Sequence, residues 1–182
     1  MSTLPHQVIE ESERRWAYVV AAVIGFVLAA IVFSSLHFTS QPPSNVETID
    51  ASRLHLAGEF VEENLGTAVQ PDGSVIVRVI AQQYSFVPAC IVVPANAPVV
   101  FRVTSPDVIH GFLITDTNVN TMVVPGFIAE VRTRFDKPRD HLMPCHEYCS
   151  VGHEGMWAHV RVVDPQQFAK SYGSQARASC AG

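Results

Sequence analysis

The segment from Cys145 to Met156 reads CHEYCSVGHEGM and brings together four side chains that can bind soft metal ions. Cys149 lies four residues after Cys145, His153 follows four residues later, and Met156 three residues after that. Thiolate, imidazole and thioether ligands together favour copper over magnesium, calcium or manganese. The segment therefore predicts a copper site, with a structural zinc ion or a simple disulfide as the alternatives.

A further histidine, His110, lies upstream in the run SPDVIHGF. Loops at one end of a β-sandwich can meet, so His110 is expected to close the site from another loop. A blue-copper site uses one cysteine, two histidines and a weak methionine, whereas this set contains a second cysteine. Two bridging thiolates would hold two copper ions, with one imidazole for each, a weak bond from Met156 and the main-chain carbonyl of Glu147. Such a centre would relay single electrons and leave no open position for a substrate.

Four short β-branched segments are expected to form strands that position these residues. Pro, Gly, Asn and Asp separate them, which is typical of a small antiparallel sandwich or barrel. Together they predict a core domain over residues 73–164. The segments are SVIVRVI (74–80), PVVFRVT (98–104), AEVRTRF (129–135) and WAHVRVV (157–163).

An apolar run from Trp16 to Phe38 contains no Asp, Glu, Lys or Arg. As a helix it would be roughly 34 Å long, enough to cross a hydrocarbon core of about 30 Å. A cleaved signal peptide is the alternative, but the run is too long for one and no A-x-A site follows it. Arg14 and Arg15 precede the run, so residues 1–15 are expected in the cytoplasm and the rest of the chain outside.

The remaining segments are expected to be a linker and a tail. Residues 39–72 begin with a polar Gln41–Ser44 stretch, and DASRLHLAGEFVEENL (50–65) predicts a short amphipathic helix. Residues 165–182 are expected to be loosely held.

Residues 73–164 carry eight acidic and seven basic residues, and this lack of a basic patch argues against nucleic acid as a partner. Cys90 and Cys180 are not ligands by position; a bridge between them is conceivable, but the sequence offers no geometric support for it.

The chain resembles subunit II of haem-copper cytochrome c oxidases, from the anchor to about Asp164. SPDVIHGF, VPGF (124–127) and CHEYCSVGHEGMWAHV carry the resemblance. It implies a mainly β fold, a cupredoxin-like Greek-key β-sandwich or barrel with one N-terminal transmembrane helix. The single helix and the sequence SPDVIHGF resemble those of the B-type oxidases. The copper ligands that it implies are His110, Cys145, Glu147 through its carbonyl, Cys149, His153 and Met156.

This resemblance implies a single-pass electron-transfer subunit in the cell (plasma or inner) membrane of a prokaryote, with its copper domain on the periplasmic or extracellular side. The subunit would accept electrons from cytochrome c or a small cupredoxin at a binuclear CuA centre. It would pass them to haem in subunit I, which holds the haems and further copper, reduces oxygen and pumps protons. The implied partners also include membrane lipid and a small single-helix accessory subunit. A magnesium ion at the Glu147 side chain is implied by A-type members. The alternatives are a CuA subunit of a nitric oxide reductase-type complex and a stand-alone membrane-anchored copper protein.

The resemblance also suggests two further sites. QQYSF (82–86) occupies the place of an aromatic patch that receives electrons from cytochrome c, which makes Tyr84 and Phe86 candidates; ordinary core aromatics are the alternative. Glu13 resembles a glutamate at the cytoplasmic mouth of the proton channel in B-type oxidases. A solvated carboxylate near a helix start is the alternative for Glu13.

Overall fold

The computed structural model describes residues 6–37, 47–173 and 177–180. The chain divides into two compact units, Met1–Asn45 and Val46–Gly182, and each is described by itself. The described part of the first unit is one helix, α1 (His6–His37). The predicted Gln41–Ser44 linker and Phe38 lie outside the described residues.

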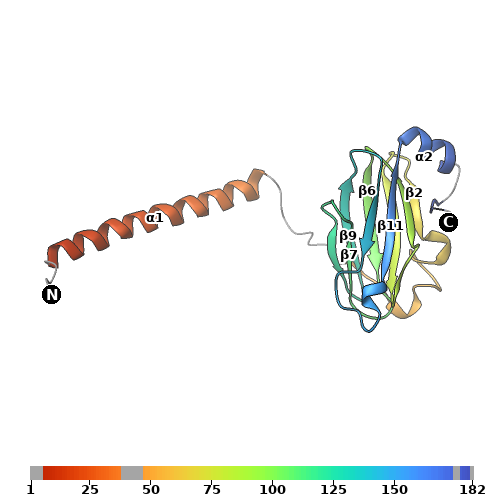
Figure 1. The fold of residues 1–182 in the computed structure, drawn as a ribbon, viewed down its shortest axis with the longest axis horizontal. Helices are drawn as coiled ribbons and strands as arrows, with labels where there is room; N and C mark the ends of the chain where they lie inside the picture. The colour runs from red at the N-terminus through yellow and green to blue at the C-terminus, as the bar shows by residue number, and fades with distance from the viewer. Residues whose placement is uncertain (1–5, 38–46, 174–176, 181–182) are drawn as a thin grey trace. The chain divides into compact units, whose positions relative to one another are not determined.

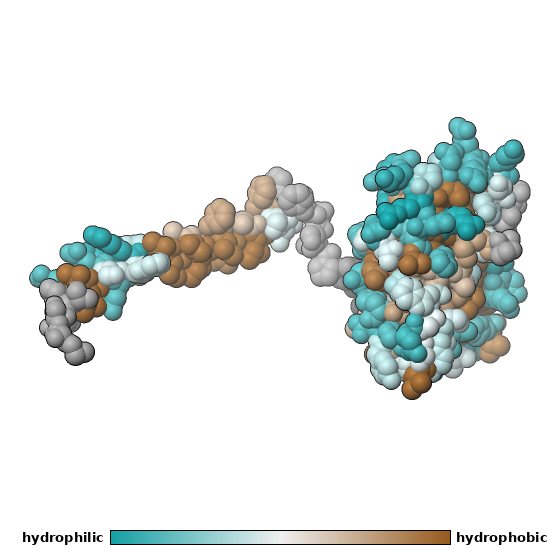
Figure 2. All heavy atoms as spheres, viewed as in Figure 1, coloured by the Kyte–Doolittle hydropathy of each residue, from teal (hydrophilic) through white to brown (hydrophobic). Residues whose placement is uncertain are grey.

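Helix α1 is long and apolar enough to cross a membrane, over Gln7–Leu36. Figure 2 shows a nearly continuous apolar surface along the helix beyond its polar first turns. The helix begins at His6, earlier than the predicted span from Trp16, so polar residues extend the same helix. Glu13 is exposed within this polar part of α1.

The second unit is a β-sandwich, in which the strands lie side by side and α2 (Pro165–Tyr172) lies near one end (Figure 1). All four segments that the sequence predicts to be strands are strands here, within one or two residues at their ends. The strands are β1 (Glu47–Thr48), β2 (Gly66–Val69), β3 (Val75–Gln82), β4 (Ser85–Val87), β5 (Cys90–Pro94), β6 (Pro98–Thr104), β7 (His110–Leu113), β8 (Asn120–Val123), β9 (Phe127–Arg134), β10 (Arg139–Pro144) and β11 (Trp157–Val163).

The strands form three sheets among the described residues. The largest has the order β1-β9-β6-β3-β2, with β4 also paired to β3, and the others have the orders β10-β11-β5 and β7-β8. The expectation of an antiparallel sandwich or barrel is wrong for two pairings, because β3 pairs with β6, and β5 with β11, in parallel. These crossovers place non-consecutive strands side by side, as a Greek-key connection does. The cupredoxin-like, mainly β fold class itself is confirmed.

Alternation of β-branched residues determines which faces are buried. On β3, Val75, Val77 and Val79 are at most 1% exposed and point into the core, while the residues between them are partly exposed. Phe101 of β6 and Phe112 of β7 pack against each other in this core, with ring centroids 5.5 Å apart. Period-two alternation with one apolar face is what a packed sheet requires. The result is a rigid core that ends where β7, β10 and β11 meet the metal-ligand candidates.

The segment predicted to be a linker with an amphipathic helix is instead part of the domain. It forms two short 3₁₀ turns, η1 (Ala51–Arg53) and η2 (Glu62–Asn64), and Gly58 between them has a φ of +100° that an α-helix cannot contain. Leu54 and Phe60 are buried against Ile80 of β3. The apolar residues of this segment therefore cover the outer face of the large sheet rather than one face of a helix.

The C-terminal segment is also held more firmly than predicted. Phe168 of α2 is 5% exposed and packs with Val92 of β5 and Ala178. A disulfide joins Cys90 at the start of β5 to Cys180. The expectation of a loose tail is wrong over the described residues, because the tail covers the otherwise exposed face of β5.

Candidate metal centre

The segment with the metal-ligand candidates is the loop between β10 and β11. Because Pro144 and Trp157 pair in the antiparallel ladder, and Cys145 N–H donates to the Met156 carbonyl at 3.1 Å, the loop is closed at its base. Its second half contains the 3₁₀ turn η3 (His153–Gly155), entered through Gly152 at φ +104°. The first residue of β7, His110, lies at the same end of the sandwich. The fold thus brings the two predicted loops together.

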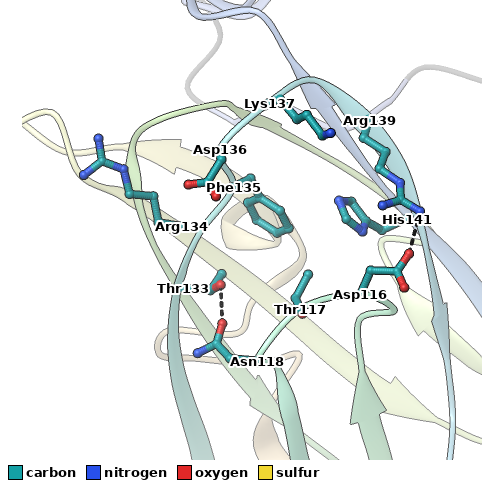
Figure 3. Close-up of a pocket in the computed structure, with 10 residues that line it drawn as sticks. All are labelled: Asp116, Thr117, Asn118, Thr133, Arg134, Phe135, Asp136, Lys137, Arg139 and His141. Carbon is teal, nitrogen blue, oxygen red and sulfur yellow. Dashed lines mark hydrogen bonds and ion pairs between the residues drawn. The ribbon is translucent and has the colours of Figure 1, made fainter.

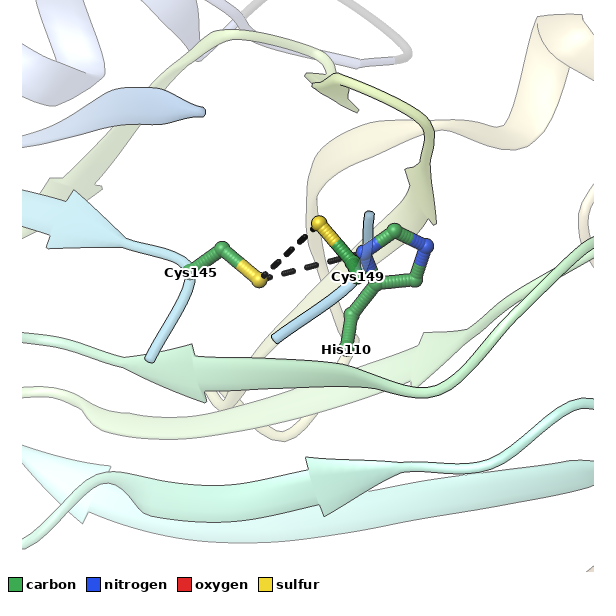
Figure 4. A group of neighbouring side chains, drawn as sticks. All are labelled: His110, Cys145 and Cys149. Atoms are coloured by element: carbon green, nitrogen blue, oxygen red, sulfur yellow. Dashed lines mark hydrogen bonds between the residues drawn. The ribbon is translucent and has the colours of Figure 1, made fainter. Parts of the chain in front are cut away.

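The two cysteines of this loop are free and buried, with Sγ atoms 3.9 Å apart. A disulfide would require about 2.05 Å, so the Cys145–Cys149 bridge that the compartment would permit is absent here. Figure 4 shows the Cys145 sulfur facing the Cys149 sulfur, with a dashed line from Cys145 Sγ to the His110 ring. His110, Cys145 and Cys149 offer ligand atoms that lie within 4.8 Å of one another.

The remaining predicted ligands surround the sulfur pair in two matching halves. His110 Nδ1 lies 3.8 Å from Cys145 Sγ, and the Glu147 carbonyl oxygen lies 3.3 Å from the same sulfur. His153 Nδ1 and Met156 Sδ lie 3.6 and 3.8 Å from Cys149 Sγ. Two donors bound to one ion at about 2.0–2.3 Å each lie at most about 4.6 Å apart, so these separations fit metal coordination.

The tautomer of His110 also suits a ligand. Its Nε2 lies 2.9 Å from Asp107 Oδ1, and the ring is fully buried. Burial of Asp107 opposes ionisation, but hydrogen bonds from the Gln83 and Val108 N–H groups and from His110 outweigh it and lower its carboxyl pKa. An ionised carboxylate only accepts, so His110 Nε2 donates to it, and Nδ1 is the ring nitrogen that faces the sulfurs. Metal-binding histidines are commonly oriented in this way.

Gly111 allows the cysteine loop to lie directly against β7. A Cβ at this position would lie 2.6 Å from Glu147 N and 2.3 Å from His146 Nδ1. Its own N–H donates to Cys145 Sγ at 3.4 Å. Since Glu147 N belongs to the backbone, a side chain at 111 would have to displace the loop. Sequence reasoning missed this role, because the close approach depends on two segments that are far apart in the chain.

The thiol of Cys149 is hard to ionise without a metal. Burial, followed by the adjacent Cys145, raises the pKa of Cys149 to about 11. A metal that binds thiolates therefore has to displace protons from this loop. The donor set, rather than a preformed charge, makes the site suitable for a soft cation.

The two aromatic candidates are placed differently. Phe86 is 1% exposed and packs edge-on against Phe112, with ring centroids 6.0 Å apart, so it cannot form part of a docking surface. Tyr84 is 42% exposed, and its ring lies over Gly152, the residue before His153 in the chain. Another exposed aromatic, Tyr148, was not identified in the sequence analysis. The centroids of its ring and of the His153 ring are 6.0 Å apart. Its place directly before Cys149 in the sequence is the feature that indicates its closeness to the site.

The Glu147 side chain is partly exposed. Among the described residues it belongs to no group of three or more His, Cys, Asp or Glu placed to hold a metal. The magnesium ion therefore stays a prediction that nothing in the described structure tests.

A separate cavity of about 210 Å³ lies at the other end of the sandwich (Figure 3). Strand β10 starts there at Arg139 and ends at the cysteine loop. Arg139 pairs with Asp116 at one side of the cavity at 2.5 Å, and Asn118 accepts a hydrogen bond from Thr133. Its wall contains none of the predicted metal ligands.

Comparisons with known proteins agree with this arrangement. A family model for "Cytochrome C oxidase subunit II, periplasmic domain" matches residues 76–163. A cytochrome c oxidase subunit 2 of Thermus thermophilus is 30% identical over 159 residues, which cover 86% of this chain and 95% of that protein. A second Thermus thermophilus cytochrome c oxidase subunit 2 is 33% identical over 121 residues, covering 66% of this chain and 90% of that protein.

The fold is also found among solved structures. A chain from a cryo-EM structure of a heme-copper terminal oxidase dimer superposes with a TM-score of 0.60. The match covers 84% of this chain and 99% of that one, at 22% sequence identity. At this identity the likeness shows the common fold and nothing finer.

Proposed function

This chain belongs to the cytochrome c oxidase subunit II family, and from that premise we propose that it holds a binuclear copper centre through six residues. The family gives a membrane-anchored subunit with an external CuA-type domain, which transfers electrons to subunit I of a haem-copper oxidase. We assign the ligands residue by residue from their positions in the β10–β11 loop and at the start of β7. They are His110, Cys145, Glu147 through its carbonyl, Cys149, His153 and Met156.

The observation that supports two ions is the pairing of donors about the two sulfurs. Each cysteine has its own imidazole, and each also has one weak donor, Glu147 O beside Cys145 and Met156 beside Cys149. A single tetrahedral zinc ion would use the four strong donors and leave both weak ones without a role. Two copper ions held by this set would use all six donors.

When bound, the copper pair would supply a one-electron carrier in a set of soft ligands. The protein would hold these ligands rigidly, because Cys145 and Met156 are bonded through their backbones at the ends of paired strands. Burial of His110 and both cysteines would exclude water from the centre. A copper carrier has to release its metal, and this degree of burial argues against that alternative.

The path of electrons and protons completes the proposal. A soluble c-type cytochrome or a small cupredoxin would dock near Tyr84, which is exposed beside the loop. Electrons would continue to haem in subunit I, where oxygen reduction is coupled to proton pumping. Glu13, exposed on the polar start of α1, would assist proton uptake on the cytoplasmic side of a prokaryotic membrane. A small single-helix subunit would complete the complex.

A metal analysis of the detergent-purified full chain tests the copper assignment. We expect two copper ions per chain and an EPR signal from an electron shared by two coppers. His153→Ala should lose that signal, while His159→Ala, an exposed histidine on the neighbouring β11, should keep it. A single-copper spectrum, or one zinc ion per chain in the wild type, would remove the proposal.

A further inference from the structure

The tip of the β3–β4 hairpin lies directly on the metal loop. Strand β4 pairs with β3 over three residue pairs, and the ladder ends at Gln82–Ser85, which leaves Gln83 and Tyr84 outside it. A two-residue tip beyond a short ladder needs other contacts to keep one position. The hydrogen bonds among those contacts are made by Gln83.

Gln83 touches both halves of the candidate centre. Its side-chain Nε2 donates to the Cys149 carbonyl at 2.8 Å. Its backbone N–H donates to Asp107 Oδ2 at 2.7 Å, and the other oxygen of Asp107 bonds His110 Nε2 at 2.9 Å. One residue therefore links the hairpin tip to a cysteine loop and to a histidine that come from different parts of the chain.

The position of Tyr84 depends on this link. Its ring atoms lie 3.5 Å from the point where a Cβ on Gly152 would stand, so the ring rests on the glycine backbone next to His153. With 42% of its surface exposed, Tyr84 extends from solvent to the residue before a predicted ligand. Electron tunnelling falls steeply with distance, so a loose hairpin tip would lengthen the path at its first step.

We propose that Gln83 is a positioning residue, which fixes the Tyr84 tip on the metal loop and thereby sets the rate at which a protein donor reduces the centre. This inference rests on the proposed copper function. Gln83 is not a ligand, so its loss leaves the six donors in place. A preorganised site of this kind needs supporting hydrogen bonds as much as the ligands themselves.

The test uses the assembled oxidase that contains the full chain. Gln83→Glu keeps the size of the side chain but removes the N–H that donates to Cys149, and Gln83→Ala removes the side chain. Gln82→Ala is the matched control, because Gln82 is the adjacent residue and its side chain bonds Ser85 within the hairpin itself. Stopped-flow absorbance follows reduction of the copper by reduced soluble cytochrome c and, separately, by ascorbate.

We expect both Gln83 variants to slow reduction by cytochrome c about tenfold, since small misplacements of a reacting group have effects of this size or larger. Reduction by ascorbate, copper content and the EPR signal should match the wild type, and so should all values for Gln82→Ala. Equal slowing with both reductants, or no slowing with cytochrome c, would overturn the inference. If Gln83→Ala does not fold, Gln83→Glu alone decides. A wild-type complex without paired copper would instead overturn the proposed function.

Discussion

The two cysteine pairs of the domain differ in their bonding. Cys90 and Cys180 are joined by a disulfide, whereas Cys145 and Cys149 are free, with their sulfurs 3.9 Å apart. Both pairs belong to a domain outside the membrane, where oxidation to a disulfide is permitted. The compartment alone therefore does not determine which pair is bonded.

The neighbours of each pair explain the difference. The disulfide lies among Val92, Phe168 and Ala178, which are apolar and offer no ligand atoms. The free pair lies within 3.9 Å of two imidazoles, a thioether and a carbonyl. A cysteine pair surrounded by soft donors is suited to metal binding. A pair surrounded by packed apolar side chains is suited to holding a segment of the chain in place.

Exchange of one free cysteine should have the largest effect. Cys149→Ser replaces a soft donor, which the proposed centre would share between two ions, with a hydroxyl that binds copper weakly, so we expect at most one copper per chain and no oxidase activity. Metal analysis and oxygen-consumption measurements on the assembled complex would check this. Retention of two coppers in the variant would contradict the shared-thiolate arrangement.

Exchange of one disulfide-bonded cysteine should lower the stability of the domain without changing its copper content. Cys180→Ser opens a loop of 90 residues, and the loss of such a native disulfide costs about 2–5 kcal/mol of unfolding free energy. Denaturant unfolding should therefore show a lower midpoint, while copper content stays at the wild-type value. A loss of copper without a loss of stability would reverse the roles of the two pairs.

Local patterns in the sequence predicted what depends on neighbours along the chain. The β-branched runs at 98–104 and 157–163 became β6 and β11 with the same bounds, because alternation with a buried face is a local property. The ligand candidates were found because thiol, imidazole and thioether groups occur together on one short loop.

Contacts between distant segments could not be predicted in the same way. Leu54 and Phe60 were assigned to an amphipathic helix, but they are buried by a sheet surface that the local pattern does not describe. The Cys90–Cys180 bridge depends on α2 folding back over β5. The role of Gly111 depends on where the cysteine loop lies, so only the folded structure reveals it.

A methyl group at position 111 should weaken copper binding by the loop without removing a ligand. Gly111→Ala would place a Cβ 2.6 Å from Glu147 N, so the loop must shift away from β7. We expect copper affinity to fall about 10- to 100-fold, the range found when groups that support ligands are lost. Competition with a copper chelator measures the affinity. Gly155→Ala is the control, because a Cβ there meets no atom within 4 Å, and equal losses in both variants would refute the close approach.

The smallest expected effect concerns the segment that no disulfide holds. Residues 47–65 are tied to the large sheet by Arg102, which bonds Glu59, Glu47 and Glu130, while Arg78 also bonds Glu59. Burial of Glu59 would raise its pKa, but its hydrogen bonds and charge attraction to Arg102, and then to Arg78, outweigh burial and lower it.

A lowered pKa makes this attachment sensitive to acid. The stabilisation is complete above the pKa of the unfolded carboxyl, ordinarily 4.5, and is lost as the pH falls through the lower pKa of the folded state. In metal-free protein we therefore expect wild-type unfolding free energy to fall more steeply below that pH than in Glu59→Gln. Glu62→Gln removes the same charge from the exposed η2 turn and should keep the wild-type slope. Parallel curves for the wild type and Glu59→Gln would show that apolar packing of Leu54 and Phe60 holds the segment without help from the charges, since that packing does not titrate.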